Sequence, residues 1–259
     1  MYKSGILIYN IFKYYGFHSR SFIRKGNDFM IKGIQKVTLL DYPGKVACTL
    51  FTGGCNFRCP FCQNSDLVLT PADVPDIPDA EIFDYLKMRK GLLDAVCITG
   101  GEPLLHKELG GFIKECRDLG YLVKLDTNGY EPEKLQELIS QGIIDYVAMD
   151  IKTCIERYPV VCGFADMDVS RILKSVEIIR NSGIEHEFRT TVVHELHSKE
   201  DFERIGQWLK GTKKYFLQLF TDSGAIIQPG LSAPTVDDMH LYLNTVKKYI
   251  PNAKLRGVE

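Results

Sequence analysis

Short apolar runs alternate with amphipathic segments along the chain from Met30 onward. The apolar runs have the length and the composition of buried strands; they cover residues 46–51, 95–99, 121–126, 145–151, 186–193 and 215–220. Each run is followed by a segment whose apolar residues recur at helical spacing, over residues 79–92, 107–119, 131–141, 169–179, 198–208 and 235–250. Six strand–helix units in a row, with short connections, predict one α/β domain built on a parallel sheet.

The number of units indicates which form this sheet takes. A complete (β/α)8 barrel takes about 250 residues and eight units, whereas residues 30–259 show six. The pattern therefore predicts a partial (β/α)6 TIM-like barrel, and an open doubly wound sheet is the other arrangement that the alternation permits. In both folds, functional residues collect where the strands end, at the C-terminal edge of the sheet.

Residues 1–29 lack this alternation and differ in composition. They are basic and aromatic, with Asp28 as their one acid. A signal peptide is a poor interpretation, because the apolar stretch from Gly5 to Phe12 is short and no small-residue cleavage site follows it. A basic amphipathic segment on a membrane surface is a second interpretation. The simplest is a poorly packed extension, with residues 30–259 forming the domain.

Composition and charge exclude several classes of protein. Apolar residues make up 45% and charged residues 25% of the 259 residues, and 32 basic residues are set against 33 acidic ones. This balance predicts a globular chain without an overall field that would draw it to nucleic acid or to an anionic membrane. No apolar run approaches the roughly 18 residues of a membrane helix. We therefore expect a cytoplasmic protein whose partners include neither a nucleic acid nor a membrane.

Three of the eight cysteines lie within eight residues, directly after the first predicted strand. Cys55, Cys59 and Cys62 form a C-x3-C-x2-C pattern, and thiolates are the ligands of iron–sulfur clusters. Three ligands on a four-iron cluster leave one iron open, which indicates a catalytic rather than a structural site. A structural zinc site is the alternative, but zinc usually takes four ligands and no second cysteine pair of this type follows. Cys48 and Cys97 fall inside strands and are expected to be buried small hydrophobes.

Polar motifs follow the next three predicted strands at the same edge of the sheet. They are Thr99-Gly-Gly-Glu-Pro103, Asp126-Thr-Asn-Gly129 and Met149-Asp-Ile-Lys152. The carboxylate of Glu102 could accept hydrogen bonds from an ammonium group. The carboxylates of Asp126 and Asp150 could coordinate a cation or bind a ribose. A polar turn or a local ion pair would explain each motif alone, so it is their position beside the cysteines that indicates one site.

The cysteine pattern, with Phe61 before the last cysteine, resembles the signature of the radical S-adenosylmethionine (SAM) superfamily, and the GGEP sequence resembles a second motif of that superfamily. The resemblance implies one [4Fe–4S] cluster held by Cys55, Cys59 and Cys62, with SAM bound at the open iron. It further implies reductive cleavage of SAM to a 5′-deoxyadenosyl radical, which abstracts hydrogen from a substrate. The cofactor then carries the hard chemistry, while the protein positions it.

The same resemblance implies SAM contacts spread over the strand ends, at Phe61, Gly100, Gly101, Glu102, Pro103, Asp126, Asn128, Asp150, Lys152 and Arg189. A monovalent cation is implied near Asp126 and Asp150. Pyruvate formate-lyase activating enzymes often carry a histidine on the sixth strand, where this chain has Gln218. A polar contact from Gln218 is therefore a weaker expectation.

The remaining histidines and cysteines receive no cofactor role. His106, His194 and His197 lie near the ends of predicted elements and are expected at the surface or as caps. Cys154 and Cys162 follow the fourth strand, but two thiols without nearby partners are too few for an auxiliary cluster.

A closer resemblance covers nearly all of residues 30–259. The opening IKGIQKVTLLDYPGK, then TGGEPLL, VAMDIKT and the terminal LRG are similar to anaerobic ribonucleoside-triphosphate reductase activating proteins and to pyruvate formate-lyase activating enzymes. The function implied is installation of a glycyl radical on a partner, the large subunit of anaerobic ribonucleotide reductase, with electrons from a flavodoxin- or ferredoxin-type donor. Because six units cannot close a barrel, we also expect a lateral opening beside the cluster.

Two other functions are compatible with the sequence. A radical SAM enzyme could act on a small molecule or on another macromolecule, for example in forming a deazapurine. A zinc-binding interaction module without redox chemistry is the alternative from a different class. Iron and acid-labile sulfide in anaerobically purified protein would exclude the zinc module, and a glycyl radical on a partner would distinguish the two enzymes.

Overall fold

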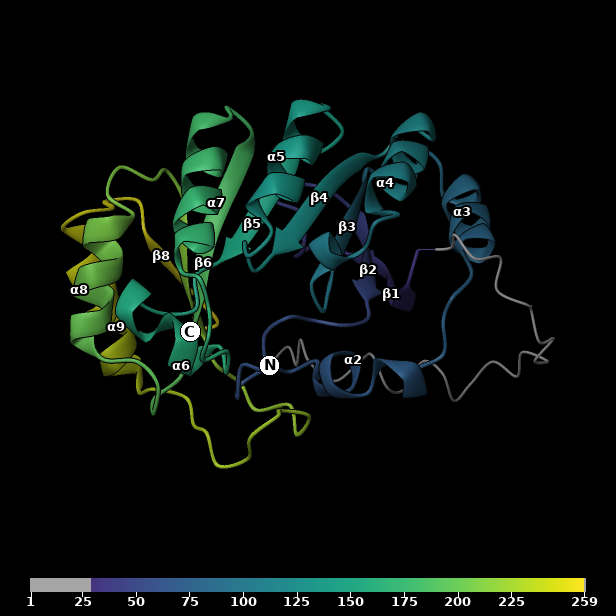
Figure 1. Ribbon diagram of the computed structural model, residues 1–259. Coiled ribbons are helices and arrows are strands. Elements are labelled where there is room, and N and C mark those ends of the chain that lie inside the picture. Colours follow the sequence, from purple (N-terminus) through teal and green to yellow (C-terminus); the bar gives the residue numbers. More distant parts are fainter. Residues whose placement is uncertain (1–28, 259) are drawn as a thin grey trace.

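The computed structural model describes residues 29–258, which are built around an eight-stranded sheet (Figure 1). In chain order the strands are β1 (Ile31–Thr38), β2 (Ala47–Thr52), β3 (Ala95–Gly100), β4 (Leu122–Thr127), β5 (Tyr146–Asp150), β6 (Glu185–Val192), β7 (Tyr215–Leu219) and β8 (Lys254–Arg256). They also lie in this order in the sheet, so each strand pairs with its neighbours in the chain. The pairs from β2 to β8 are parallel, and β1 runs antiparallel to β2.

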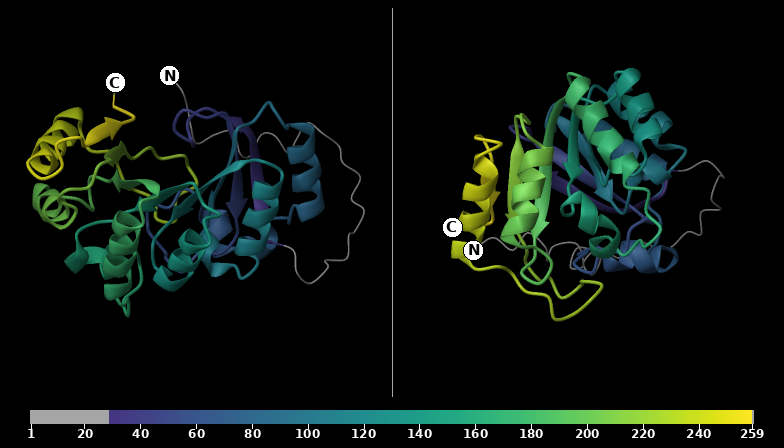
Figure 2. Two further views of the ribbon diagram at one scale, coloured as in Figure 1. Left: turned by 90° about the horizontal axis from the view of Figure 1, so that it is seen from above. Right: turned by 60° about the vertical axis from the view of Figure 1, so that its left-hand side comes forward.

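Helices cover the outer side of the curved sheet (Figure 2). The α-helices are α2 (Ser65–Leu69), α3 (Asp79–Met88), α4 (Leu109–Asp118), α5 (Pro132–Ser140), α6 (Tyr158–Val161), α7 (Ser170–Asn181), α8 (Lys199–Trp208) and α9 (Val236–Lys247). Short 3-10 turns occur at Pro71–Asp73, Pro103–Leu105 and Ile155–Arg157. Within residues 29–258, no helix combines the length and the apolar character that crossing a bilayer requires.

Alternate residues of each strand face opposite sides of the sheet. Val123 and Leu125 of β4 are fully buried in the large core between the sheet and the helices. Cys97 and Tyr146 belong to a second, smaller cluster, whose members alternate along β3 and β5 with residues of the large core. Lys124, between Val123 and Leu125, is also buried. The inner side of the sheet therefore holds the smaller apolar cluster together with charged groups such as Lys124, and the outer side holds the main core.

The structure confirms the predicted α/β fold class, a partial TIM-like barrel. The six predicted strands correspond to β2 to β7, and each is followed by a helix that the apolar spacing predicted: α3, α4, α5, α7, α8 and α9. Two edge strands were not predicted. The buried residues of β1 include Lys32, Gly33 and Thr38, which break its apolar pattern, and β8 has three residues, which is too short for a periodic signal. The sheet stays open, because β1 does not pair with β8.

The predicted boundary at Met30 is misplaced by one residue at least. Phe29 was assigned to the extension, but its side chain is 1% exposed and packs against Phe112 of α4 and the ring of His106. Its backbone N–H donates to the Asp79 carboxylate at 3.0 Å. The expectation about the rest of the extension concerns residues 1–28, which lie outside the described part of the chain.

Candidate active site

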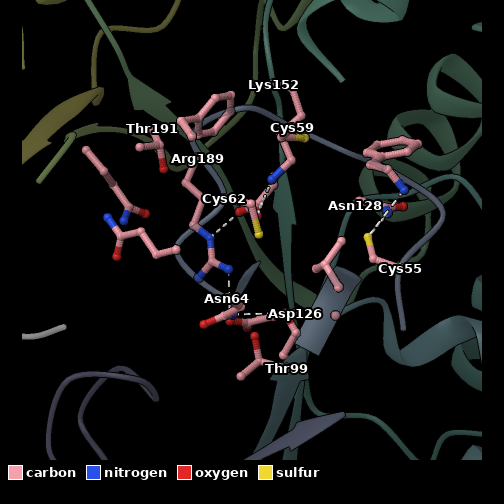
Figure 3. Close-up of a pocket in the computed structure, with 18 of the residues that line it drawn as sticks. Cys55, Cys59, Cys62, Asn64, Thr99, Asp126, Asn128, Lys152, Arg189 and Thr191 are labelled. Atoms are coloured by element: carbon pink, nitrogen blue, oxygen red, sulfur yellow. Dashed lines mark hydrogen bonds and ion pairs between the residues drawn. The ribbon is translucent and has the colours of Figure 1, made fainter. Parts of the chain in front are cut away.

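A cavity of about 590 Å³ lies at the C-terminal ends of the parallel strands (Figure 3). The loops after β2, β3, β4, β5 and β7 contribute to its wall, together with residues of β6 and β7. Its lining brings together most of the residues that the sequence predicted: Cys55, Cys59, Phe61, Cys62, Gly100, Gly101, Asp126, Asn128, Asp150, Lys152, Arg189 and Gln218. The rule that function collects at this edge of a parallel sheet therefore holds.

The loop that carries the cysteines is held against the loop after β3. Gly54 adopts a φ of +83°, which favours glycine, and its carbonyl accepts a hydrogen bond from the Glu102 N–H at 2.8 Å. A Cβ atom at Gly101 would lie 1.8 Å from that carbonyl oxygen. Gly101 is thus needed for the two backbones to approach this closely, and Gly54 is needed for the turn that presents its carbonyl.

The three thiols lie in different surroundings within the cavity. The Cys55 sulfur accepts hydrogen bonds from the Phe57 N–H at 3.4 Å and from the Asn128 amide at 3.8 Å. Burial raises the pKa of Cys55 to about 12 and also raises the pKa of Cys62. A hydrogen bond from Cys162 lowers the pKa of Cys59.

The donor set of the cavity consists of three thiols. Zinc needs its ligands gathered at about 2.0–2.3 Å from one centre. Within residues 29–258, no group of three or more His, Cys, Asp or Glu side chains is gathered closely enough to hold a single ion. Three thiols that line one cavity match in number the ligands of a four-iron cluster with one open iron.

Glu102 and Pro103 do not line the cavity. The Glu102 carboxylate, suggested by the sequence for an ammonium group, instead accepts hydrogen bonds from the Leu104 N–H (3.1 Å), the Thr127 hydroxyl (2.7 Å) and the Asn128 N–H (2.7 Å). The side chain is buried, and burial raises its pKa to about 7. Glu102 therefore connects the loop after β3 to the loop after β4.

Asp126 and Asp150 belong to a network of buried charges. Arg189 donates to Asp126 Oδ2 at 2.8 Å and also binds Asp150 Oδ1, while Lys152 donates to Asp150 Oδ2 at 2.8 Å. Lys124 binds Asp126 Oδ1. Burial opposes ionisation of both aspartates, but the neighbouring cations outweigh it and lower the pKa of each carboxyl. Because all four carboxylate oxygens are paired, these residues do not fit a further monovalent cation.

Several residues of the cavity escaped the sequence reasoning. Asn64 donates to the Gly100 carbonyl at 3.0 Å, and Thr191 lines the cavity two residues after Arg189. Residues 221–223 also contribute to the wall. The period of two along β6 and the end of β7 were signals that could have found Thr191 and residues 221–223.

The segment after β7 crosses to the cysteine loop. The Gln63 amide donates to the Thr221 carbonyl at 2.7 Å, and the Gln228 N–H donates to the Pro60 carbonyl at 2.9 Å. Gln218, at the end of β7, lines the cavity with a buried Oε1 that has no protein partner. This oxygen is therefore placed to make the polar contact with a ligand that the sequence suggested for Gln218.

The expected surface position of His197 is wrong. Its side chain is 5% exposed, and the ring contacts the Lys152 carbonyl through Nε2 at 2.8 Å and the Val193 N–H through Nδ1 at 3.1 Å. Burial lowers the pKa of His197. The ring therefore fixes the backbone at Lys152 rather than capping an exposed helix end.

Cys154 and Cys162 face different partners. The Cys154 thiol donates to Asp201 at 3.1 Å. The Cys162 thiol contacts Cys59 instead, and the backbone carbonyl of Cys162 accepts a hydrogen bond from the Arg58 N–H at 2.8 Å. This separation gives no basis for an auxiliary cluster that would include both.

Comparison with known proteins decides the family. The family model described as the Radical SAM superfamily matches residues 49–209, which is more than half of the chain. This chain belongs to the radical SAM superfamily. The match begins inside β2 and ends after α8. It thus covers the cysteine loop and most of the strand ends around the cavity.

Two relatives of this radical SAM protein come from Methanocaldococcus jannaschii. One, 32% identical over 88% of this chain and 96% of its own length, is named "Putative glycyl-radical enzyme activating enzyme". The other carries the same description and is 27% identical over 62% of each chain. SuiB of Streptococcus suis, solved with bound S-adenosylmethionine, has a TM-score of 0.62 at 16% identity over 78% of this chain. Since the match covers 48% of SuiB, it shows the shared fold alone.

Proposed function

We propose that this radical SAM protein cleaves SAM at a [4Fe–4S] cluster and installs a glycyl radical on a partner enzyme. The observation that carries the proposal is the cavity at the strand ends, where three thiols face a rim of fixed charges and glycine backbone. The installation of a glycyl radical is supported by the relative that aligns with 88% of the chain and is named for glycyl radical activation. The partner we propose is the large subunit of anaerobic ribonucleotide reductase.

The cluster would be held by Cys55, Cys59 and Cys62, one thiolate on each of three irons. When bound, the cluster would supply one electron to SAM, whose C–S bond would break to give methionine and a 5′-deoxyadenosyl radical able to abstract a hydrogen atom from the partner's glycine. Burial favours the neutral thiols of Cys55 and Cys62 in the metal-free protein. Loading should therefore release protons, as metal binding to thiols generally does.

The rim of the cavity would bind and orient SAM. Gly100 and Gly101 line the cavity and would offer backbone groups to the methionyl group of SAM. Arg189 and Lys152 carry positive charge suited to a carboxylate, and a guanidinium matches its planar geometry. The Phe61 ring, with the Lys152 ammonium 5.9 Å from its centroid, would exclude water beside the thiols. Asp126, Asn128 and Asp150 would complete this set of contacts.

Glu102 and Pro103 do not line the cavity and would act on SAM through the residues that do. Glu102 binds the N–H groups of Leu104 and Asn128 and so fixes the loops after β3 and β4. Pro103 begins the 3-10 turn that follows. Their contribution to SAM binding is then to hold Gly100, Gly101 and the Asn128 side chain in place.

The partner would approach where the barrel stays incomplete. β1 and β8 do not pair, so the sheet does not enclose its inner side. We infer that the glycine loop of the partner enters beside the cavity and completes its wall. Enclosure would protect the radical from water and from stray hydrogen donors. A flavodoxin- or ferredoxin-type protein would supply the electron.

The test is anaerobic mixing of the cluster-loaded protein with reductant, SAM and candidate glycyl radical enzymes, followed by electron paramagnetic resonance. A glycyl radical that appears only with SAM and a partner is the expected result. Cys59→Ala should abolish it, whereas Cys116→Ala, a buried cysteine of α4 outside the cavity, should not. Zinc without iron in the purified protein, or rapid turnover of a small molecule without a partner, would overturn the proposal.

A further inference from the structure

The inner side of the sheet carries a lysine that the sequence reasoning passed over. Lys124 lies in the middle of β4, with its side chain 2% exposed. It points to the same side as Asp126, two residues further along the strand. Lysine is almost never fully buried unless its charge is paired. The position of Lys124 in mid-strand therefore indicates that its charge has a fixed partner within the fold.

That partner is one carboxylate oxygen of Asp126. Each of the four carboxylate oxygens of Asp126 and Asp150 contacts a lysine or arginine side chain. Lys124 binds Asp126 Oδ1, and Arg189 bridges Asp126 Oδ2 and Asp150 Oδ1. Lys152 binds the remaining oxygen, Asp150 Oδ2, at 2.8 Å. Figure 3 shows the Arg189 guanidinium facing Asp126, with a dashed line for their ion pair. Three fixed cations thus face two carboxylates, and this network of five side chains has one excess positive charge.

Such a network is unfavourable for a metal cation. Hard cations bind through oxygen ligands, above all carboxylates. A sodium or potassium ion would have to displace an ammonium or guanidinium group from Asp126 or Asp150. It would also add a second excess positive charge to a buried site, where like charges repel strongly.

We propose that Lys124 takes the place of an exchangeable monovalent cation at Asp126, so that SAM binding by this protein does not depend on sodium or potassium. The inference rests on the proposed function, because it takes SAM as the ligand of the cavity. If Arg189 turns toward the carboxylate of SAM, Lys124 still neutralises Asp126 and Lys152 still neutralises Asp150. A tethered ammonium does this without the entropic cost of capturing a free ion.

The first test uses the unaltered, cluster-loaded protein. The dissociation constant of SAM is measured by titration calorimetry under anaerobic conditions in choline, sodium and potassium chloride at equal ionic strength. We expect the three values to agree within about two-fold, which is less than half of a kcal/mol. Binding about ten-fold tighter in sodium or potassium than in choline would overturn the proposal.

The second test removes the ammonium and keeps the length of the side chain. Lys124→Met should bind SAM about ten-fold more weakly in choline chloride and recover in sodium or potassium chloride, because Asp126 then has an oxygen free for an ion. The double variant Lys124→Met/Asp126→Asn is the matched control, since it has no carboxylate at this place and should not recover. A Lys124→Met protein whose SAM affinity is the same in all three salts would show that Lys124 is only structural.

A third readout needs neither cluster nor SAM. An ion that binds the folded state raises the unfolding temperature. The cluster-free Lys124→Met protein should therefore unfold at a higher temperature in potassium or sodium chloride than in choline chloride, while the unaltered protein should not. If Lys124→Met fails to fold, the comparison of salts on the unaltered protein decides alone. Ion-independent SAM binding without a glycyl radical on any partner would contradict the proposed function and leave the role of Lys124 intact.

Discussion

At the scale of single residues, two buried side chains next to the cavity act on the backbone. Glu102 accepts hydrogen bonds from two N–H groups and one hydroxyl. His197 contacts the carbonyl of Lys152. Neither lines the cavity, although both lie next to residues that do. Substitutions of Glu102 and His197 should therefore change the free energy of unfolding and the positions of the loops more directly than the cleavage of SAM.

Replacing Glu102 with glutamine should destabilise the fold. A carboxylate accepts all three hydrogen bonds, whereas an amide turns one NH₂ group toward a donor and leaves a buried N–H or hydroxyl unpaired. An unpaired buried group costs about 1–3 kcal/mol. The free energy of unfolding in urea measures the loss. If Glu102→Gln unfolds like the unaltered protein but binds SAM weakly, the carboxylate contacts the ligand directly, contrary to its position here.

His197 should make stability depend on pH below about 6.5, its ordinary pKa. Burial lowers the pKa of the ring in the folded state. At pH values between that lowered pKa and about 6.5, His197 is therefore protonated in the unfolded chain and neutral in the folded protein. Stability therefore falls as the pH falls through this window, by about 1.4 kcal/mol for each unit of the shift.

The measurement compares the free energy of unfolding of the unaltered protein and of His197→Gln at pH 7, 6 and 5. The advantage of the unaltered protein should shrink as the pH falls, because glutamine does not titrate. An advantage that stays constant or grows toward pH 5 would contradict the buried neutral ring.

At the scale of elements, the site depends on the contact between two loops. The loop after β2 carries the thiols and the loop after β3 carries Gly101, and the Glu102 N–H joins them through the Gly54 carbonyl at 2.8 Å. Because a backbone atom, not the end of a flexible side chain, faces Gly101, the contact cannot adapt to added volume.

Gly101→Ala should separate these loops. The new Cβ would lie 1.8 Å from the Gly54 oxygen, and overpacking of this kind costs about 1–3 kcal/mol or more. We expect a lower free energy of unfolding and less iron retained after anaerobic reconstitution. Gly111→Ala is the matched control: it lies in α4 with no atom within 4 Å of the added Cβ, and should stabilise by about 0.5–1 kcal/mol. Equal iron content in the two variants would argue against the loop contact.

The strand ends and the positions of the motifs on them were predictable, because apolar periodicity and turn residues are local signals. The direction in which a side chain points was not predictable, because it depends on contacts with distant residues. Glu102 could face a ligand or the protein, and two of its three donors, Thr127 and Asn128, lie some 25 residues later at the end of β4. A lysine in the middle of a buried strand has no explanation in the sequence alone. Its charge is explained only by the ion pair with Asp126, which also binds Arg189. β1 lacked a signal because its buried residues include Lys32, Gly33 and Thr38, which break the apolar pattern.

At the scale of the whole molecule, the folded domain begins before Met30. Phe29 packs between α4 and the loop that holds His106. A chain that begins at Met30 loses this ring, and removing a buried phenylalanine costs about 3–5 kcal/mol. A chain that begins at Asp28 keeps it and is the matched control. We expect the shorter chain to unfold at a clearly lower temperature by calorimetry; equal temperatures would show that Phe29 contributes little.

The strand order of the sheet also bears on how the protein is made. Each strand from β2 to β8 pairs with the one synthesised just before it, so a nascent chain can extend the sheet strand by strand as it leaves the ribosome. The links between the cysteine loop and the segment after β7, from Gln63 to Thr221 and from Gln228 to Pro60, form only near the end of translation. For most of its synthesis the cysteine loop is therefore uncovered on that side, and cluster insertion has its widest access before the chain is complete.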